Sequence, residues 1–270
     1  MNDRVKIDLK DGVADVRLVR ADKMNALDDA MFGALVEAGE HLKTASGVRA
    51  VVLSGEGRAF CAGLDMGNFG AMASGDRRSR DAVAAPPART ERGANRAQQA
   101  VLVWREVPVP VIAAVHGVAF GGGFQLALGA DMRYVAPDTR MAIMEIKWGL
   151  VPDMAGFVLM KHLVREDLLR ELTYTGRIFN GEEAFRLGFA TRVCTDPLSE
   201  ALATAAEIAS KNPHAQRANK RLFDLAATTG DEGAILRLES KEQGALIGSP
   251  NQIEAVMSNM QKRDPKYAEV

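Results

Sequence analysis

The chain has 270 residues, of which 47% are hydrophobic, so it can bury a full core and disorder of the whole chain is excluded. Its 34 Lys and Arg residues nearly cancel its 35 Asp and Glu residues, which leaves no overall field to attract nucleic acid or an anionic membrane surface. Cys61 and Cys194 lack the spacing of a zinc site or a disulfide framework, and no membrane-length apolar run or leader pattern is present, so we expect a cytoplasmic protein without metal or membrane contact.

Strands and helices alternate through the first half of the chain. Apolar and polar residues alternate on both sides of Asp11-Gly12, which predicts a β-hairpin over residues 5–19. Apolar residues then recur with helical and strand periods in turn. The predicted elements are a helix over 28–43, a strand over 48–53, a helix over 95–104, a strand over 109–115, a helix that ends at Gly129 and a strand over 132–136. This order predicts an α/β fold.

Two further segments differ in composition from the rest. Residues 74–92 are rich in Arg, Ala, Ser, Asp and Pro without an apolar period, which predicts a mobile surface segment that is either a lid or an ordinary loop. From residue 198 onward the pattern is helical, with helices predicted over 198–211, 213–228, 232–246 and 250–262. We therefore divide the chain into a core over residues 1–197 and a C-terminal helical region over 198–270.

Two glycine-containing turns point to the chemistry. The apolar strand over 109–115 leads into Gly121-Gly122-Gly123, which opens an Ala/Leu-rich helix. The first turn of a helix has unpaired N–H donors and the positive end of its dipole, and glycines there let an anionic oxygen approach the main chain. A second turn, Arg58–Asp65, follows the strand over 48–53 and can add another donor to the same oxygen. Two convergent N–H groups predict an oxyanion hole for a carbonyl oxygen that gains charge.

Seven blocks of the sequence stand in the order and at the spacing of a known family. They are Met24–Leu27, Arg49–Asp65, Pro110–Asp131, Gly149–Asp153, Leu172–Ala184, Leu187–Ala190 and Gln261–Tyr267. On these blocks the chain resembles the crotonase (enoyl-CoA hydratase/isomerase) superfamily over nearly its whole length. The resemblance implies a spiral of ββα units, a C-terminal helical trimerisation region, and a homotrimer or a hexamer made of two trimers. It also implies an acyl-CoA thioester substrate, with coenzyme A entering as part of that substrate and no separate cofactor.

The resemblance assigns binding roles to particular residues. It implies that the N–H groups of Leu64 and Gly122 hold the thioester oxygen. The substrate-binding residues expected around them are Ala62, Gly63, Asp65 and Gly121 from the two turns, and Lys23 and Lys262 for the phosphates of coenzyme A. Lys262 lies in a basic tail with Arg263 and Lys266, which we expect to act from a neighbouring subunit or else to be a solvated charge run. For Lys23 the alternative to binding the phosphates is likewise a solvated side chain.

The catalytic positions favour isomerisation. Family hydratases carry two glutamates where this chain has Gln125 and Glu145, and an amide can orient water but cannot exchange a proton near neutral pH. Glu145 stands among apolar residues, which predicts a raised pKa. Asp153 occupies a position where family dienoyl-CoA isomerases have an acid that works with the glutamate eight residues earlier. Those isomerases also have an aspartate at the Gln125 position, which this chain lacks. The dehalogenase branch pairs an acid at the Asp153 position with a tryptophan where this chain has Glu145.

We therefore expect an acyl-CoA enzyme in which Glu145, with or without Asp153, moves a proton of an enoyl- or dienoyl-CoA. The alternatives are a hydratase that uses Glu145 while Gln125 positions water, and a non-catalytic acyl-CoA-binding scaffold. Each acid also has a structural interpretation: Glu145 as a surface partner of Lys147, and Asp153 as a helix cap. His116 is predicted to be structural. A serine peptidase and a nucleotide-phosphate loop are disfavoured, because neither Gly-x-Ser-x-Gly nor Gly-Lys-Ser/Thr is present.

Overall fold

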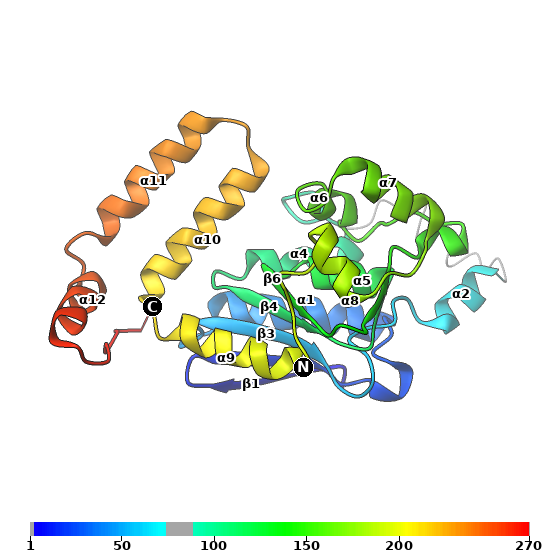
Figure 1. Ribbon diagram of the computed structural model, residues 1–270, viewed down its shortest axis with the longest axis horizontal. Helices are drawn as coiled ribbons and strands as arrows, with labels where there is room; N and C mark the ends of the chain where they lie inside the picture. The colour runs from blue at the N-terminus through cyan, green and yellow to red at the C-terminus, as the bar shows by residue number, and fades with distance from the viewer. Residues whose placement is uncertain (1–2, 74–88, 270) are drawn as a thin grey trace.

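The protein is built on a six-stranded sheet with the order β1-β2-β3-β4-β6-β8, in a computed structural model that describes residues 3–73 and 89–269 (Figure 1). Its strands are β1 (Val5–Lys10), β2 (Val13–Leu18), β3 (Ala50–Gly55), β4 (Val111–Val115), β6 (Met132–Val135) and β8 (Arg192–Val193). β1 and β2 are antiparallel, as the Asp11-Gly12 turn predicts, and both turn residues have positive φ. The later pairings are parallel and are joined by helical crossovers, so the predicted α/β class is confirmed.

A second, small sheet holds the two glycine turns together. It consists of the parallel strands β5 (Val118–Phe120) and β7 (Arg140–Ala142), and isolated parallel bridges pair Cys61 with Ala119 and Leu27 with Leu64. The sequence did not predict these strands, because three residues are too few to establish a period. Their pairing sets the turn after Cys61 beside the turn after Phe120.

The large sheet is covered on both faces. Side chains alternate along β3, so that Val51 and Leu53 face one cluster while Ala50 and Val52 face another. The first cluster packs under α1 (Asp29–Thr44) and α4 (Arg96–Glu106), which contact each other along their length. The second packs against α9 (Pro197–Ala209), the first helix of the C-terminal region, through alanines that recur every fourth residue: Ala201, Ala205 and Ala209.

Short helices surround the smaller sheet. They are the 3-10 helices η1 (Ala21–Lys23) and η2 (Glu145–Trp148) and the helices α2 (Met66–Ala73), α5 (Gly122–Leu128), α6 (Gly156–Met160), α7 (Glu166–Thr175) and α8 (Gly181–Leu187). Of these, only α5 was predicted. Phe124 of α5 packs edge-on against Phe179 and Phe189, with ring centroids 5.8 and 5.0 Å apart. Because all three rings are buried, they fix the orientation of α5 and of the residue that follows Phe124.

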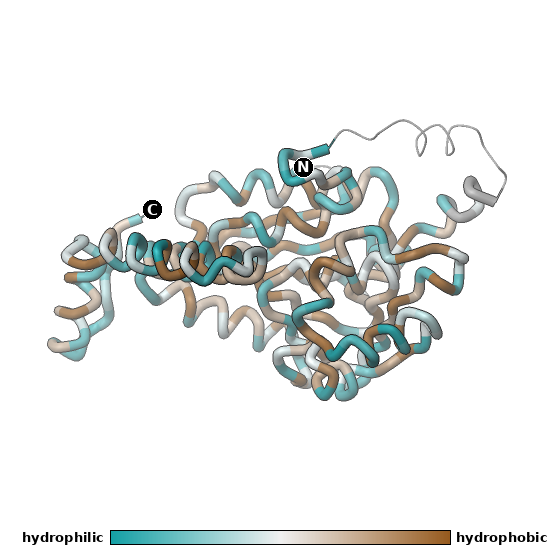
Figure 2. The backbone as a smooth tube through the Cα atoms, turned by 90° about the horizontal axis from the view of Figure 1, so that it is seen from above, coloured by the Kyte–Doolittle hydropathy of each residue, from teal (hydrophilic) through white to brown (hydrophobic). Residues whose placement is uncertain are grey.

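The last three helices form an arm beside the body (Figures 1 and 2). They are α10 (Pro213–Thr228), α11 (Glu232–Leu246) and α12 (Pro250–Gln261), and their bounds agree closely with the prediction. Each begins at a side chain that caps the first turn: Asn212, Asp231 and Ser249. Lys220 anchors α10 to the sheet, since its buried Nζ donates to Asp131 Oδ2 at 2.8 Å and to Val109 O at 2.9 Å.

Three predictions from the sequence concern the segment over residues 74–92, membrane-spanning helices and metal ligands. Residues 74–88 of the predicted mobile segment 74–92 lie outside the described residues, and residues 89–92 are exposed. No helix in the described part of the chain is both long and apolar enough to cross a bilayer. Within the same residues, no three His, Cys, Asp or Glu side chains are grouped as metal ligands.

Candidate active site

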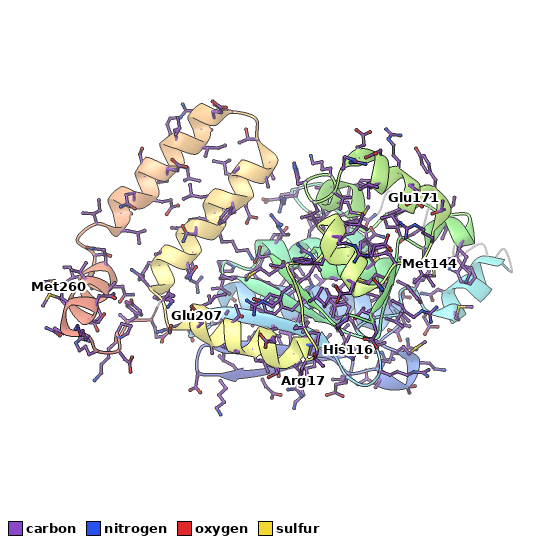
Figure 3. The ribbon with its side chains drawn as sticks, in the orientation of Figure 1. Arg17, His116, Met144, Glu171, Glu207 and Met260 are labelled. Atoms are coloured by element: carbon purple, nitrogen blue, oxygen red, sulfur yellow. The ribbon has the colours of Figure 1, made fainter. Side chains whose placement is uncertain are left out.

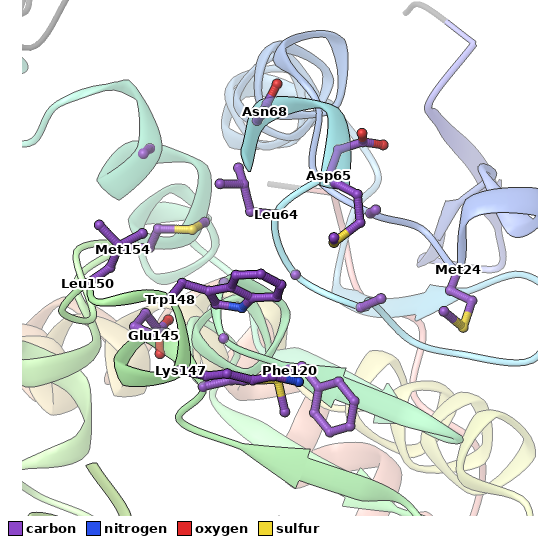
Figure 4. Close-up of a pocket in the computed structure, with 18 of the residues that line it drawn as sticks. Met24, Leu64, Asp65, Asn68, Phe120, Glu145, Lys147, Trp148, Leu150 and Met154 are labelled. Carbon is purple, nitrogen blue, oxygen red and sulfur yellow. The ribbon is translucent and has the colours of Figure 1, made fainter. Parts of the chain in front are cut away.

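A pocket of about 1540 Å³ opens between the two glycine turns and the segment from η2 to α6 (Figure 4). It is lined by nine of the residues predicted from the sequence: Lys23, Ala62, Gly63, Leu64, Asp65, Gly121, Gly122, Glu145 and Asp153. These residues come from η1, the turn after β3, the start of α5 and the segment from η2 to α6. The fold therefore brings together side chains that lie more than a hundred residues apart in the sequence.

The two glycine turns touch each other. Gly63 has φ +88°, and a Cβ at this position would lie 2.5 Å from Phe120 O and 3.7 Å from Gly122 N. Leu27 N donates to Gly63 O, and Asp65 N donates to Leu27 O, so the residues on either side of Leu64 are fixed. Within residues 3–73 and 89–269, neither Leu64 N nor Gly122 N donates a hydrogen bond. Two adjacent turns thus each present a backbone N–H group that has no partner among the described residues.

Asn25 supports the first turn from behind, a role that sequence reasoning missed. Its fully buried side chain accepts a hydrogen bond from Arg20 N at 2.9 Å and donates to Glu56 O and Ala59 O at 3.0 and 2.8 Å. Asn25 itself has φ +54°, a conformation that asparagine adopts more readily than most residues. The Met24–Leu27 motif therefore joins the N-terminal strands to the turn that carries Leu64.

Asp65 is bound within the protein. Its Oδ2 accepts a hydrogen bond from Arg20 Nη1 at 2.6 Å, and its Oδ1 accepts one from Gly67 N at 2.8 Å, at the start of α2. These bonds, with the Gly67 N–H contributing most, lower the pKa of Asp65 below its ordinary value. Its carboxylate thus fixes the end of the turn that carries Leu64, and Arg20 is a further residue beside the pocket that the sequence did not indicate.

Glu145 is the buried acid of the pocket. Its side chain is only partly open to the pocket, and Oε1 accepts a hydrogen bond from Gln125 Nε2 at 2.6 Å. Oε2 is buried and has no hydrogen-bond partner among the described residues. Burial raises the pKa of Glu145, although bonds from Gln125 and from the backbone offset part of the rise. The alternative that Glu145 is a surface partner of Lys147 is wrong, because Lys147 Nζ instead lies 5.6 Å from the centre of the Trp148 ring.

Glu145 also adjoins the second glycine turn, at Gly121. A Cβ on Gly121, which has φ +49°, would lie 3.3 Å from Glu145 Oε1. In a 3-10 helix the residues i and i+3 are eclipsed, so Glu145 and Trp148 project from the same side of η2. Figure 4 shows both side chains, with Leu64 and Phe120, around the pocket that all four line. Glu145 thus stands against an apolar, aromatic wall, and its burial there is the physical cause of its raised pKa.

Gln125 lies behind Glu145 and is 1% exposed. Its Oε1 accepts hydrogen bonds from Met154 N and Gly156 N, both at 2.9 Å, while its Nε2 donates to Glu145. Ala155, between the two donors, has φ +66°. The carboxamide is therefore bonded at both ends to protein groups.

Asp153 lines the same pocket from the segment that joins η2 to α6. Desolvation by the surrounding protein atoms raises the pKa of the Asp153 carboxyl. The negative charge of Asp153 in turn raises the pKa of Glu145. The alternative role as a helix cap is wrong, because α6 begins after Ala155 without a side-chain cap. Two acids with raised pKa values therefore share one pocket.

Four exposed basic residues line the pocket, but Lys262 is not among them. Lys23, Arg96, Arg140 and Lys147 line it, and all but Lys23 were missed from the sequence. Lys262 lies just after α12, and Figure 3 shows Met260 of that helix at the far end of the arm from Met144, which lines the pocket. In a single chain, Lys262 is thus remote from the pocket. His116 bonds Gly57 O at 2.9 Å through Nε2 and is absent from the pocket lining, in keeping with the structural role predicted for it.

Comparisons with known proteins place the chain in one family. The family model described as enoyl-CoA hydratase/isomerase matches residues 8–270. The chain is 30% identical over 246 residues to a Bacillus subtilis (strain 168) protein named "Probable enoyl-CoA hydratase", covering 90% of each. It is 32% identical over 262 residues to the mitochondrial Delta(3,5)-Delta(2,4)-dienoyl-CoA isomerase of Mus musculus, covering 94% of this chain and 78% of that protein. The structure of an enoyl-CoA hydratase from Bacillus anthracis matches with a TM-score of 0.86 and 26% identity, over 98% of each chain. The chain therefore belongs to the enoyl-CoA hydratase/isomerase family, and its fold is the crotonase fold that the sequence predicted.

Proposed function

We propose that this enzyme shifts a double bond of an enoyl-CoA or dienoyl-CoA through a thioester enolate. Glu145 Oε2 takes a proton from C2 of the acyl group, and the electron pair of that C–H bond moves onto the thioester oxygen, which the N–H groups of Leu64 and Gly122 hold. The electrons then return through the conjugated chain. A proton is delivered at C4 of a 3-enoyl group by Glu145, or at C6 of a 3,5-dienoyl group by Asp153, so one proton is removed and one added.

The observation that carries the proposal is Glu145 Oε2, a carboxylate oxygen without a hydrogen-bond partner among the described residues that lies beside the glycine turns. Hydration requires one group to activate water and another to deliver a proton, and the Gln125 carboxamide has no proton to exchange near neutral pH. Isomerisation requires only a base that can return its proton. Asp153 in the same pocket supports the dienoyl form of the reaction, for which the mouse relative is named.

Substrate turnover tests the proposal. Purified enzyme is incubated with 3-enoyl-CoA, 3,5-dienoyl-CoA and crotonyl-CoA, and the rise or fall in absorbance of the conjugated thioester is followed. We expect isomerisation of one of the first two, and Glu145→Gln should lower its kcat by about 100-fold or more. The control Glu207→Gln changes a carboxylate on the exposed face of α9 and should leave kcat unchanged.

Hydration of crotonyl-CoA that far outpaces isomerisation identifies a hydratase instead. Tight acyl-CoA binding without turnover identifies a scaffold.

The arm supports a second proposal, that the enzyme is a homotrimer or a hexamer of two trimers. Large apolar side chains on α10, α11 and α12 are more than half exposed in the single chain: Phe223, Leu236, Ile253 and Met260. A neighbour that covers this arm would also bring in a basic tail, so that Lys262 of one subunit reaches the coenzyme A bound by another, opposite Lys23. Light scattering coupled to gel filtration measures the oligomeric state. A monomer at micromolar concentration rejects the proposal.

A further inference from the structure

The orientation of the Gln125 carboxamide is fixed by the groups that it meets. Its Oε1 faces two backbone donors, Met154 N and Gly156 N, at 2.9 Å each. A flipped amide would point an NH2 group at two other N–H groups and leave all of them unpaired in a buried site, at a cost of about 1–3 kcal/mol for each group. The NH2 end must therefore face Glu145, as the 2.6 Å bond to Oε1 records.

We infer that Gln125 is a positioning residue that holds Glu145 by Oε1 and leaves Oε2 as the one oxygen that moves the proton. This inference rests on the proposed function, since it specifies how the proposed base is held. It differs from the role expected from the sequence, in which the Gln125 amide orients a water molecule. Both ends of that amide are already bonded to protein groups, and Gln125 is absent from the residues that line the pocket.

The same carboxamide sets the position of the second acid. Met154 and Gly156 flank Ala155, whose φ of +66° costs about 1–2 kcal/mol for a residue with a Cβ. This conformation turns two N–H groups toward one acceptor, and the two hydrogen bonds offset the strain. A Cβ on Gly156 would lie 2.7 Å from Gln125 Oε1, so a larger residue would displace the carboxamide. Because Asp153 directly precedes Met154, Gln125 couples the positions of Asp153 and Glu145.

Besides positioning Glu145, the Gln125 carboxamide donates a hydrogen bond without carrying a charge. An N–H donor stabilises the ionised form of Glu145 and so opposes the rise in pKa that burial causes. A glutamate at position 125 would put two carboxylates at hydrogen-bond distance, and they would have to share a proton. Besides Glu145, the charged side chains that line the pocket are Asp22, Lys23, Asp29, Asp65, Arg96, Arg140, Lys147 and Asp153. Changes at position 125 leave all of them in place.

Two substitutions test the inference. Gln125→Met keeps the length of the side chain but removes the donor, so we expect kcat for isomerisation to fall by about tenfold or more with little change in KM. The acid limb of the kcat profile should move to higher pH, because the ionised base has lost a hydrogen bond. In Gln125→Glu the limb should move further up, and hydration of crotonyl-CoA should rise by about tenfold or more relative to isomerisation, because a second exchangeable carboxyl has been supplied.

Gln99→Met is the matched control. Gln99 is also a buried glutamine that donates to a glutamate, with its Nε2 2.9 Å from Glu106 Oε2, but it lies on α4 and does not line the pocket. Its substitution should leave the acid limb unchanged even where stability falls. An acid limb that neither Gln125 variant moves overturns the inference and leaves Gln125 with a structural role only. If Gln125→Met does not fold, Gln125→Glu still offers an acceptor to Met154 N and Gly156 N and carries the test.

Failure of the proposed function is separable from failure of this inference. If the wild type turns over none of the three thioesters, the proposed function fails, and the inference is then tested without activity. Carbon-13 NMR of labelled glutamate carboxyls gives the pKa of Glu145, identified as the signal lost in Glu145→Gln. That pKa must rise in Gln125→Met and stay unchanged in Gln99→Met. An unchanged pKa in both variants rejects the hydrogen-bonded role of Gln125.

Discussion

The substitution Gly63→Ala tests the contact between the two donor turns. A Cβ at this position would lie 2.5 Å from Phe120 O, whereas contacts under 3.0 Å are essentially never seen and relaxed ones begin near 3.4 Å. The turns must therefore separate by about 0.5–0.9 Å, which is the difference between those distances and 2.5 Å. Loss of one oxyanion donor costs about 10²–10³ in kcat. We expect kcat to fall by about 100-fold, or about 2.7 kcal/mol, with KM changed far less.

The assay compares kcat and KM for the substrate that the wild type isomerises, measured on protein whose thermal unfolding is still cooperative. Gly70→Ala is the control, because Gly70 lies on α2, has open space around it and lacks a positive φ. It should keep full activity. A folded Gly63→Ala variant with nearly wild-type kcat would refute the assignment of the oxyanion hole to Leu64 and Gly122.

Three further predictions concern the base and the frame that holds the pocket. Because burial raises the pKa of Glu145 above 4.5 and the base must be ionised, the acid limb of kcat/KM should lie above that pH; activity that persists unchanged down to pH 4.5 contradicts a buried base. Asn25→Ala removes the hydrogen-bond partner of Arg20 N, Glu56 O and the buried Ala59 O, so urea unfolding should show a loss of about 3 kcal/mol, and a loss below 1 kcal/mol would be too small for three bonds. Lys220→Met breaks a buried ion pair with Asp131 and should lower stability by about 3–5 kcal/mol while KM stays unchanged; a changed KM would link the arm directly to the pocket.

Sequence patterns predicted the elements that are long enough to show a period. The hairpin around Asp11-Gly12, the helix α1 and the four C-terminal helices are present close to the predicted bounds. The strands β5 and β7 were missed, because three residues are too few to establish a period. The helices α2, α6, α7 and α8 were also missed, although α7 spans ten residues. The small sheet that joins the donor turns therefore had to be seen in the structure.

The sequence predicted which residues line the candidate site, but not the hydrogen bonds that hold them in place. Glycine placement indicated the two turns, because only glycine allows so close an approach of backbones at Gly63, which faces Phe120 O, and at Gly123, which faces Cys61 O. The role of Gln125 depends on N–H groups of residues 154 and 156, and that of Arg20 depends on Asp65, so neither is encoded in a local motif. Long-range hydrogen bonds of single side chains leave no periodic signal in a sequence.

Left-handed backbone at residues other than glycine has a practical consequence for engineering. Of the five such residues in the described chain, Met24, Asn25 and Ala155 lie on or directly behind the pocket wall. Glycine at Ala155 would relieve about 1–2 kcal/mol of strain but would also slacken the loop that presents Asp153. Heat tolerance is better sought at exposed helical glycines such as Gly244, where alanine meets no atom of the chain. A variant in which the backbone strain at these residues is relieved would be more stable, but we expect it to be slower, because the strained backbone holds the pocket wall in place.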